Sequence, residues 1–253
     1  MHTDTIEQMS QQIWPPLEQL QSKDLVLRYA KGFTNRANSA TVTAYSARSL
    51  PGIQNRVEKY FSDKALPASV KIDRNLGATE LDNYLACNGY SMQGESLTMT
   101  TEISINSDFS TKLRQMDKRD WLNVYYGMNP QLLRYRSVHS DLLARIKGRI
   151  KFAVLQNKIR APVSCAIAVQ VENYVGLLNV CTDPCFRRQG AASRLVTGLL
   201  AWSSSNNARQ AFLTVDAANT AAISLYEKLG FMTKRKCWYR TKYTQKRREN
   251  ERH

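Results

Sequence analysis

The sequence predicts an α/β (α+β) protein in which a mixed, mostly antiparallel sheet is flanked by helices. Two observations predict this class. Short strand patterns alternate with helical patterns along the chain, and three consecutive strand patterns between residues 151 and 182 indicate an antiparallel meander. Apolar residues make up 43% of the 253 residues and charged residues 23%, which is typical of a globular chain and too apolar for a disordered one.

The first half of the chain reads as an initial helix followed by alternating strands and helices. Pro15 and Pro16 close the initial helix, because proline lacks the backbone donor that a helix needs. Ile53, Val57 and Phe61 have helical spacing, and Gly89 suits a left-handed C-cap. In chain order we expect a helix over Thr5–Leu20, a strand over Leu25–Ala30, a turn over Lys31–Asn35 into a second short strand, a helix over Ile53–Leu66, a strand over Ser69–Asp73, a helix over Thr79–Asn88 and a strand over Tyr90–Ile105.

The second half begins after a polar stretch, Asn106–Lys112, which we take as a domain boundary. Asn129 is placed as an N-cap with Pro130 at the first helical position of the helix that follows. The expected elements are helices over Lys118–Tyr126 and Pro130–Ile146, strands over Lys151–Gln156, Val163–Val171 and Tyr174–Thr182, a helix over Arg188–Ser205, a strand over Phe212–Asp216, a helix over Asn219–Leu229, and one or two strands over Phe231–Tyr243. The expected domains are therefore residues 1–105 and 106–253.

The two halves resemble each other in their order of helix, strand, helix and strand. Leu81-x-x-Tyr84 with Gly89-Tyr90 parallels Ile223-x-x-Tyr226 with Gly230-Phe231 in the placement of aromatic residue, glycine and aromatic residue. The pattern favours an internal repeat, although a chance similarity between two α/β segments gives the same pattern.

The formal net charge of +15 is concentrated at the carboxyl end. Residues 234–253 hold nine Lys or Arg residues against Glu249 and Glu251, and so supply +7 of the total. Such a tail is typical of a solvated end, and less often of a contact with nucleic acid or an acidic partner. We do not favour a nucleic-acid contact on charge alone.

Targeting and metal-site signals are weak. No apolar run approaches the 18–20 residues that span a bilayer, and the amino-terminal segment has no apolar core of a signal peptide, so we expect a cytoplasmic protein without a membrane partner. The cysteines and histidines are too scattered for a metal site, and we expect buried, reduced thiols. The five cysteines are Cys87, Cys165, Cys181, Cys185 and Cys237.

The segment from Leu177 to Leu195 carries the clearest chemical signal. An apolar strand ends at Pro184, and a loop with small residues opens directly into a helix. The first amides of a helix have no internal partner and lie at the positive end of its dipole, so they can hold a pyrophosphate. Small side chains leave that approach clear, and two guanidinium groups beside it suit phosphate oxygens. The alternative is a basic helix start with small packing residues. The residues concerned are Arg187, Arg188, Gly190, Ala191 and Ala192.

A second motif follows about thirty residues later, from Leu213 through Asn219 and Tyr226 to Phe231. Together the two motifs resemble the GNAT family of acetyl-CoA-dependent N-acetyltransferases over roughly residues 118–243. Arg187-x-x-Gly190-x-Ala192 looks like the pyrophosphate loop of that family, with Ala in place of the more frequent second Gly.

The resemblance implies a role for each matching residue. The strand ending at residues 180–182 would splay from its neighbour to admit the pantetheine arm, and a main-chain N–H near Cys181 would polarise the thioester carbonyl. Tyr226 would protonate the departing thiolate, since a phenol can act as a general acid. The acceptor amine would attack directly. The residues implied for cofactor binding are Val180, Cys181, Thr182, Arg187, Arg188, Gln189, Gly190, Ala191, Ala192, Ser193 and Asn219.

Each of these roles has a structural alternative. Asn219 is also a good N-cap, and Tyr226 could be simple core packing. Packing is favoured over nucleophilic catalysis for Cys181 and Cys185, because no histidine lies nearby in sequence. Asp183 and Glu172 are the candidate bases, and most such carboxylates are only solvated.

The amino-terminal half lacks the Arg-x-x-Gly-x-Ala pattern after Pro51 and looks like a degenerate copy of the same fold. Its polar turn at Thr34–Ser39 either closes over the acceptor side or satisfies its own backbone groups. We therefore expect an acetyl-CoA-dependent N-acetyltransferase that acts on a small-molecule or peptide amine, without a metal. The alternative is a non-catalytic acyl-CoA- or RNA-binding module.

Overall fold

The computed structural model describes residues 5–74, 78–103 and 113–243, and its chain divides into two compact units. The first unit consists of Met1–Pro15, Thr98–Val215 and Asn219–Lys234, and the second of Pro16–Leu97, Asp216–Ala218 and Arg235–His253. This division differs from a single boundary after residue 105, since each unit takes one end of the chain from the opposite half. None of the helices in the described ranges is long and apolar enough to cross a membrane.

The first unit is built on five strands of mixed direction. β7, β8 and β9 form an antiparallel meander, β6 pairs with β7, and β10 pairs in parallel with β9 after the α6 crossover. The elements of this unit are α1 (Thr5–Ile13), β6 (Arg114–Gln115), α4 (Lys118–Met128), η3 (Pro130–Tyr135), α5 (Arg136–Ala144), β7 (Arg149–Gln156), β8 (Pro162–Val171), β9 (Tyr174–Thr182), η4 (Pro184–Phe186), α6 (Ala191–Ser204), β10 (Gln210–Asp216) and α7 (Thr220–Lys228).

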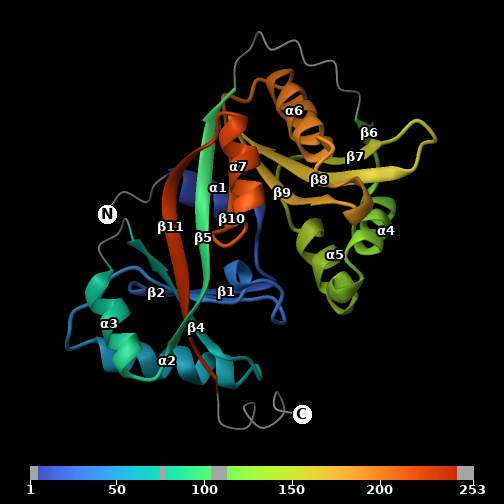
Figure 1. The fold of residues 1–253 in the computed structure, drawn as a ribbon. Helices are drawn as coiled ribbons and strands as arrows, with labels where there is room; N and C mark the ends of the chain where they lie inside the picture. Colours follow the sequence, from blue (N-terminus) through green and yellow to red (C-terminus); the bar gives the residue numbers. More distant parts are fainter. Residues whose placement is uncertain (1–4, 75–77, 104–112, 244–253) are drawn as a thin grey trace. The chain divides into compact units, whose positions relative to one another are not determined.

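Helices cover both faces of this meander (Figure 1). α6 lies on one face with Leu195 and Leu199 fully buried, and α4 and α5 lie on the other with Trp121 and Leu142 fully buried. The segment that follows α1 packs on the α5 side, where the ring of Trp14 lies 5.5 Å from that of His139. Burial of these apolar faces is the main favourable term that holds the unit together.

The second unit repeats the order of strand, helix, strand and helix on a smaller scale. Its strands run in the order β1, β2, β3, β4 and β11, with β3 and β4 parallel and the other pairs antiparallel. The buried cluster that includes Leu25, Ile53, Phe61 and Leu81 forms its core. Its elements are β1 (Glu18–Gln21), β2 (Leu25–Tyr29), η1 (Asn35–Ala37), β3 (Ala40–Val42), α2 (Leu50–Ser62), β4 (Ala68–Asp73) and α3 (Thr79–Cys87); β5 (Ser91–Glu102) and β11 (Met232–Lys242) contribute to both units.

Several expected elements end at different residues. The first helix stops at Ile13, before the two prolines, and residues 18–21 form strand β1, so the helical assignment beyond residue 13 is wrong. Residues 130–135 form a 3₁₀ helix ahead of α5, so the single helix over Pro130–Ile146 is also wrong. The last expected segment is one strand, β11. The proposed boundary at Asn106–Lys112 lies outside the described residues.

Part of the basic carboxyl end belongs to the fold. In β11, Arg235 pairs with Asp73 at 2.6 Å, and both side chains are buried. Arg240 donates two hydrogen bonds of 2.7 Å to Asp82. Lys236 and Lys242 pair with Glu95 and Glu58 at 2.8 and 3.0 Å. A solvated end is therefore wrong for this stretch, because its charges are compensated inside the second unit.

Candidate functional site

The pairing of β9 with β10 ends before β9 does, and we call the place where the two strands part the slot. The two parallel strands are in register from Tyr174–Gln210 to Leu177–Leu213, and β9 continues for five more residues. Beyond Leu177 no Cα partners join β9 to β10 in this register, so the regular parallel ladder ends there. An extended ligand arm with amide groups fits such a gap as an added strand does.

A β-bulge lies in the same stretch of β9. Leu178 and Cys181 pair with residues of β8 that are only two positions apart, so β9 has one extra residue between them. Asn179, in this interval, has a φ of +52°. A bulge leaves its extra residue out of the ladder and bends the strand. The backbone of Asn179 and Val180 therefore lies outside regular pairing with β8, directly before the paired residue Cys181.

The loop between β9 and α6 presents main-chain donors at a helix start. Arg188 and Gly190 both have left-handed backbone angles, with φ of +58° and +75°. The first main-chain hydrogen bond into α6 runs from the N–H of Arg194 to the carbonyl of Gly190 at 3.0 Å, so the amides before it lie outside the helical ladder. A Cβ atom at Gly190 would meet nothing within 4 Å, which shows that the approach is open.

The charge around this helix start is positive. Arg187, Arg188 and Arg194 are exposed, and the first turn of α6 holds no acidic residue. Arg187 Nε donates to the carbonyl of Thr182 at 3.4 Å, which holds that side chain over the end of β9. Because the helix dipole and the guanidinium groups act in the same sense, the loop is suited to a pyrophosphate.

Tyr226 and Asn219 lie on α7, the helix that follows β10. The Tyr226 side chain is 6% exposed, its ring lies 5.8 Å from that of Phe231, and burial raises the pKa of its phenol to about 12. Asn219 is the N-cap of α7, since its Oδ1 accepts from the Ala222 N–H at 3.1 Å. Both structural alternatives therefore describe real contacts. A role in binding or catalysis is compatible with each of them.

The structure separates the two candidate bases. Asp183 directly follows β9 and accepts a hydrogen bond from the Cys185 N–H at 2.9 Å as the cap of η4. Glu172 is exposed in the turn before β9. At about 3.3 Å per residue along the strand, it lies about 30 Å from Thr182. The structure does not bring Glu172 to the slot.

Two cysteines of this region, Cys165 and Cys181, are suited to packing, whereas Cys185 is exposed, as is Cys87, so the expectation of buried thiols is wrong for these two. Burial raises the pKa of the Cys181 thiol, which also accepts a hydrogen bond from the Asn129 side chain at 3.1 Å. Cys165 is fully buried beside Met128, and burial raises its pKa as well. Thiols held protonated in this way are poor nucleophiles. Among the described residues, no group of three or more His, Cys, Asp or Glu side chains could hold a metal ion.

A buried polar cluster beneath the bulge was not found from the sequence. His139 of α5 is fully buried, and its Nδ1 lies 3.1 Å from the hydroxyl of Tyr126. Asn179 Nδ2 donates to the hydroxyl of Tyr125 at 3.4 Å. The sequence predicts only that these tyrosines and His139 lie in helices, and a lone histidine gives no signal of a partner.

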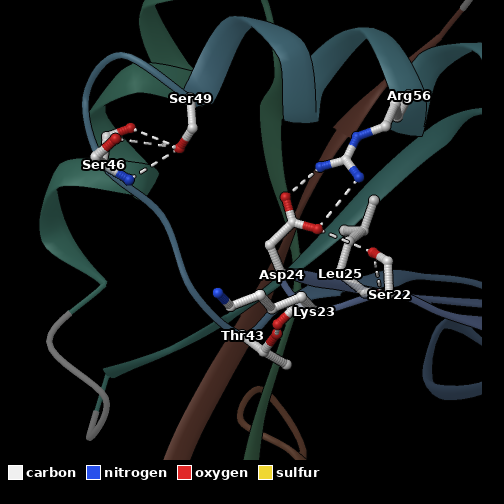
Figure 2. Close-up of polar contacts among 8 residues, drawn as sticks. All are labelled: Ser22, Lys23, Asp24, Leu25, Thr43, Ser46, Ser49 and Arg56. Atoms are coloured by element: carbon white, nitrogen blue, oxygen red, sulfur yellow. Dashed lines mark hydrogen bonds and ion pairs between the residues drawn. The ribbon is translucent and has the colours of Figure 1, made fainter.

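The loop before α2, the helix between the parallel strands β3 and β4 of the second unit, has a different structure (Figure 2). Before α2, the Ser46 N–H donates to the Ser49 hydroxyl at 2.9 Å, and that hydroxyl donates to the Ser46 carbonyl at 2.9 Å. Pro51, in the first turn, has no N–H. Arg56 is held by an ion pair with Asp24, which Figure 2 shows below the helix. The polar groups of Ser46 and Ser49 in this loop are therefore hydrogen-bonded to each other.

The polar turn of residues 34–39 is also satisfied locally. Asn38 is buried, its Oδ1 accepts from the N–H groups of Ala30 and Gly32 at 2.7 and 2.9 Å, and its Nδ2 donates to the Thr34 carbonyl at 2.8 Å. Of the two roles considered for this turn, the structure shows the local one for Asn38.

Comparisons with known proteins extend over both units. A family model described as "Probable histone acetyltransferase Rv0428c C-terminal" matches residues 3–240. The chain is 27% identical over 247 residues to "Uncharacterized N-acetyltransferase YobR" of Bacillus subtilis, covering 94% of this chain and 97% of that one. It is 35% identical over 82 residues to "[Ribosomal protein bS18]-alanine N-acetyltransferase" of Escherichia coli, covering 32% of this chain and 54% of the relative.

Among solved structures, the fold is similar to that of a protein titled "GCN5-related N-acetyltransferase from Kribbella flavida". The TM-score is 0.68 at 14% identity, with 93% of each chain covered. At this identity the likeness concerns the fold, and it includes the mixed, mostly antiparallel sheet flanked by helices that the sequence predicts.

Proposed function

The chain belongs to the family described as "Probable histone acetyltransferase Rv0428c C-terminal" and is an N-acetyltransferase of the GNAT type, and we propose that it transfers an acetyl group from acetyl-CoA to a primary amine. The observation that carries the proposal is the union of three features in one unit: an open parallel pair, a bulge on one of its strands, and a helix start with free amides and arginines.

The pantetheine arm fits the gap between β9 and β10, with main-chain partners from Val180, Cys181 and Thr182. The amide side chain of Asn219 keeps Nδ2 for a carbonyl of the arm, since no hydrogen bond within the described ranges uses that atom. Arg187 adds charge beside the pyrophosphate. The amides of residues 188–193, from Arg188 through Gln189, Gly190, Ala191 and Ala192 to Ser193, face the pyrophosphate as in other helix-start anion sites.

The reaction proposed is a direct displacement. The amine nitrogen attacks the thioester carbonyl carbon, and a main-chain N–H near Cys181 stabilises the negative charge on the carbonyl oxygen. The C–S bond then breaks, the thiolate takes the hydroxyl proton of Tyr226, and the nitrogen of the new amide loses a proton to solvent or a base. Because burial raises the pKa of Tyr226 to about 12, the phenol is protonated at neutral pH and holds the proton that a general acid must supply.

We do not propose a non-catalytic binding module, because the family and the Bacillus subtilis relative are both described as acetyltransferases. For the acceptor we propose a peptide amine. The Escherichia coli relative is named for an alanine of a ribosomal protein, and the family description names histones.

We further propose that the second unit is a degenerate copy that does not bind acetyl-CoA. Two observations support this. Its parallel pair β3 and β4 is joined through α2 as β9 and β10 are joined through α6, and the Ser46–Ser49 turn occupies the groups that would face a phosphate.

The donor site is tested by titrating acetyl-CoA into the wild-type protein and two variants by calorimetry. Gly190→Glu places a carboxylate among the amides and is expected to abolish micromolar binding. Gly190→Ala is the matched control, because it has the same left-handed strain without the charge, and it is expected to weaken binding by less than about tenfold. Equal binding by wild type and Gly190→Glu would contradict the site.

A further inference from the structure

The bulged part of β9 is tied to α4 by two side-chain amides that the proposed mechanism does not use. Asn179 Nδ2 donates to the hydroxyl of Tyr125 at 3.4 Å. Asn129, at the end of α4, donates from Nδ2 to the Tyr125 carbonyl at 2.9 Å and to Cys181 Sγ at 3.1 Å. Two residues of β9, Asn179 within the bulge and Cys181 directly after it, are thus both attached to the same turn of one helix.

That turn is itself firmly held. The Tyr125 side chain is buried, and its ring stacks on Trp121 with centroids 5.1 Å apart and planes 14° apart. The Tyr125 ring also lies 5.5 Å from that of His139, edge to face. An anchor inside a close-packed core moves little, because protein interiors are packed like organic crystals.

We propose that Asn179, supported by Asn129 and Tyr125, is a positioning residue that aims the bulged backbone of β9 at the thioester carbonyl. This inference rests on the proposed function, since it assigns the means by which the main-chain N–H near Cys181 reaches the oxyanion. A donor must lie within a few tenths of an ångström of its productive position to stabilise a developing charge. Backbone that lies outside the hydrogen-bond ladder of the sheet reaches such a defined position only when other contacts, here the side-chain hydrogen bonds to α4, hold it in place.

A simpler role for Asn179 must be separated from this one. Asparagine is among the residues that best tolerate a left-handed backbone, so the residue could serve only its φ of +52°. Glycine tolerates the same angle and has no side chain. Asn179→Gly therefore still allows the left-handed backbone angle but removes the side-chain hydrogen bond to Tyr125. Asn207→Gly is the matched control, because it makes the same substitution at another left-handed asparagine, with φ of +64°, in the turn after α6.

The test uses acetyl-CoA labelled with ¹³C at the carbonyl as the probe, with infrared difference spectra and calorimetry on the same proteins. A carbonyl that accepts a hydrogen bond stretches at lower frequency than the free thioester. We expect a lowered band in wild type and in Asn207→Gly. In Asn179→Gly we expect the band to return toward the free value while the Kd for acetyl-CoA changes by less than about threefold.

Each outcome decides the matter. An unchanged lowered band in Asn179→Gly would overturn the inference and leave the proposed function intact. A wild-type band at the free frequency with acetyl-CoA bound would overturn the inference together with the main-chain donor proposed near Cys181. Absence of binding by wild type would overturn both the inference and the proposed function. Tyr125→Phe removes only the hydroxyl that accepts from Asn179, and it is expected to shift the band in the same direction, which keeps the test decisive if the glycine variant does not fold.

Discussion

Burial acts on Tyr226 and His139 in opposite directions, because it disfavours the charged form of each. For the Tyr226 phenol the charged form is the anion, so burial raises the pKa to about 12 and the proton stays on. For His139 the charged form is the cation, and burial lowers the pKa to about 4. At neutral pH both side chains are uncharged. Tyr226 can then give a proton, while the neutral His139 ring serves as a packed partner for Tyr126.

The His139 pKa predicts how stability depends on pH. The unfolded chain binds a proton near pH 6.5 and the folded chain only near pH 4, so the unfolded state holds more protons in between. Stability contributed by the neutral ring is complete above pH 6.5 and falls as the pH is lowered to 4. The loss is on the order of 3 kcal/mol at most, from 1.36 kcal/mol per pKa unit.

Denaturant titration between pH 7 and 4 measures this loss. The fluorescence of Trp14 and Trp121, whose rings lie 5.5 and 6.2 Å from His139, reports on the surrounding core. His139→Gln is expected to be less stable at pH 7 and to lack most of the fall seen in wild type. If wild type and His139→Gln fall in parallel, His139 is not the group that titrates.

At the scale of single elements, β11 shows how charge is used in the second unit. Asp82 of α3 accepts from Arg240 Nε and Nη2 and from Trp238 Nε1, each at 2.7 Å. The hydrogen bond from Arg240 holds the pKa of Asp82 below its usual range. Two hydrogen bonds from the guanidinium group and one from the indole hold this carboxylate, and with it α3, against β11. They stabilise the contact more than a solvent-exposed salt bridge would.

Asp82→Asn is expected to lower the free energy of unfolding by about 1–3 kcal/mol at neutral pH, because Arg240 is left half-buried without a charge partner. The difference from wild type should shrink as the pH falls through the lowered pKa of Asp82, where wild type also loses the carboxylate. Thermal unfolding at pH 7 and 3 measures both. Asp63→Asn, at the exposed pair with Lys59, is the control and should change stability by less than about 0.5 kcal/mol. An Asp82 effect no larger than that of Asp63 would contradict the account.

The sequence predicts the elements around the candidate site well and the contacts beneath it poorly. β9 has the expected bounds, and the Gly190 and Asn219 patterns lie at helix starts, because local spacing and capping preferences are enough to predict such features. The bulge at Asn179 depends on which residue of β8 lies opposite it. A register shift of this kind has no signature in one strand read alone.

The same reason explains the errors at the ends of the chain. Residues 18–21 continue an amphipathic helical spacing, yet they pair with β2, so tertiary pairing overrides local pattern. The basic residues of β11 looked solvated because three of their carboxylate partners, Asp73, Asp82 and Glu58, are more than 150 residues away in sequence.

For the whole molecule, the family model and the Bacillus subtilis relative extend over both units, while the chemistry is proposed for one. The first unit holds the slot, the bulge and the helix start. The second has the same order of elements with a closed loop. Tyr84 is the counterpart of Tyr226 in the repeat pattern of the sequence. Tyr84→Phe and Tyr226→Phe each remove one hydroxyl, and we expect only Tyr226→Phe to affect catalysis.

The most direct measurement is the release of free thiol from acetyl-CoA in the presence of two acceptor peptides. One peptide begins with alanine and offers a free α-amine. The other has the same sequence with a blocked amino terminus and an added lysine, so it offers only the lysine side-chain amine. We expect release that requires a free amine. Tyr226→Phe should lower kcat by about a hundredfold or more with nearly unchanged acetyl-CoA affinity, and Tyr84→Phe should retain the parent rate. Acetyl-CoA binding without release for either amine, or a parent rate in Tyr226→Phe, would contradict the account.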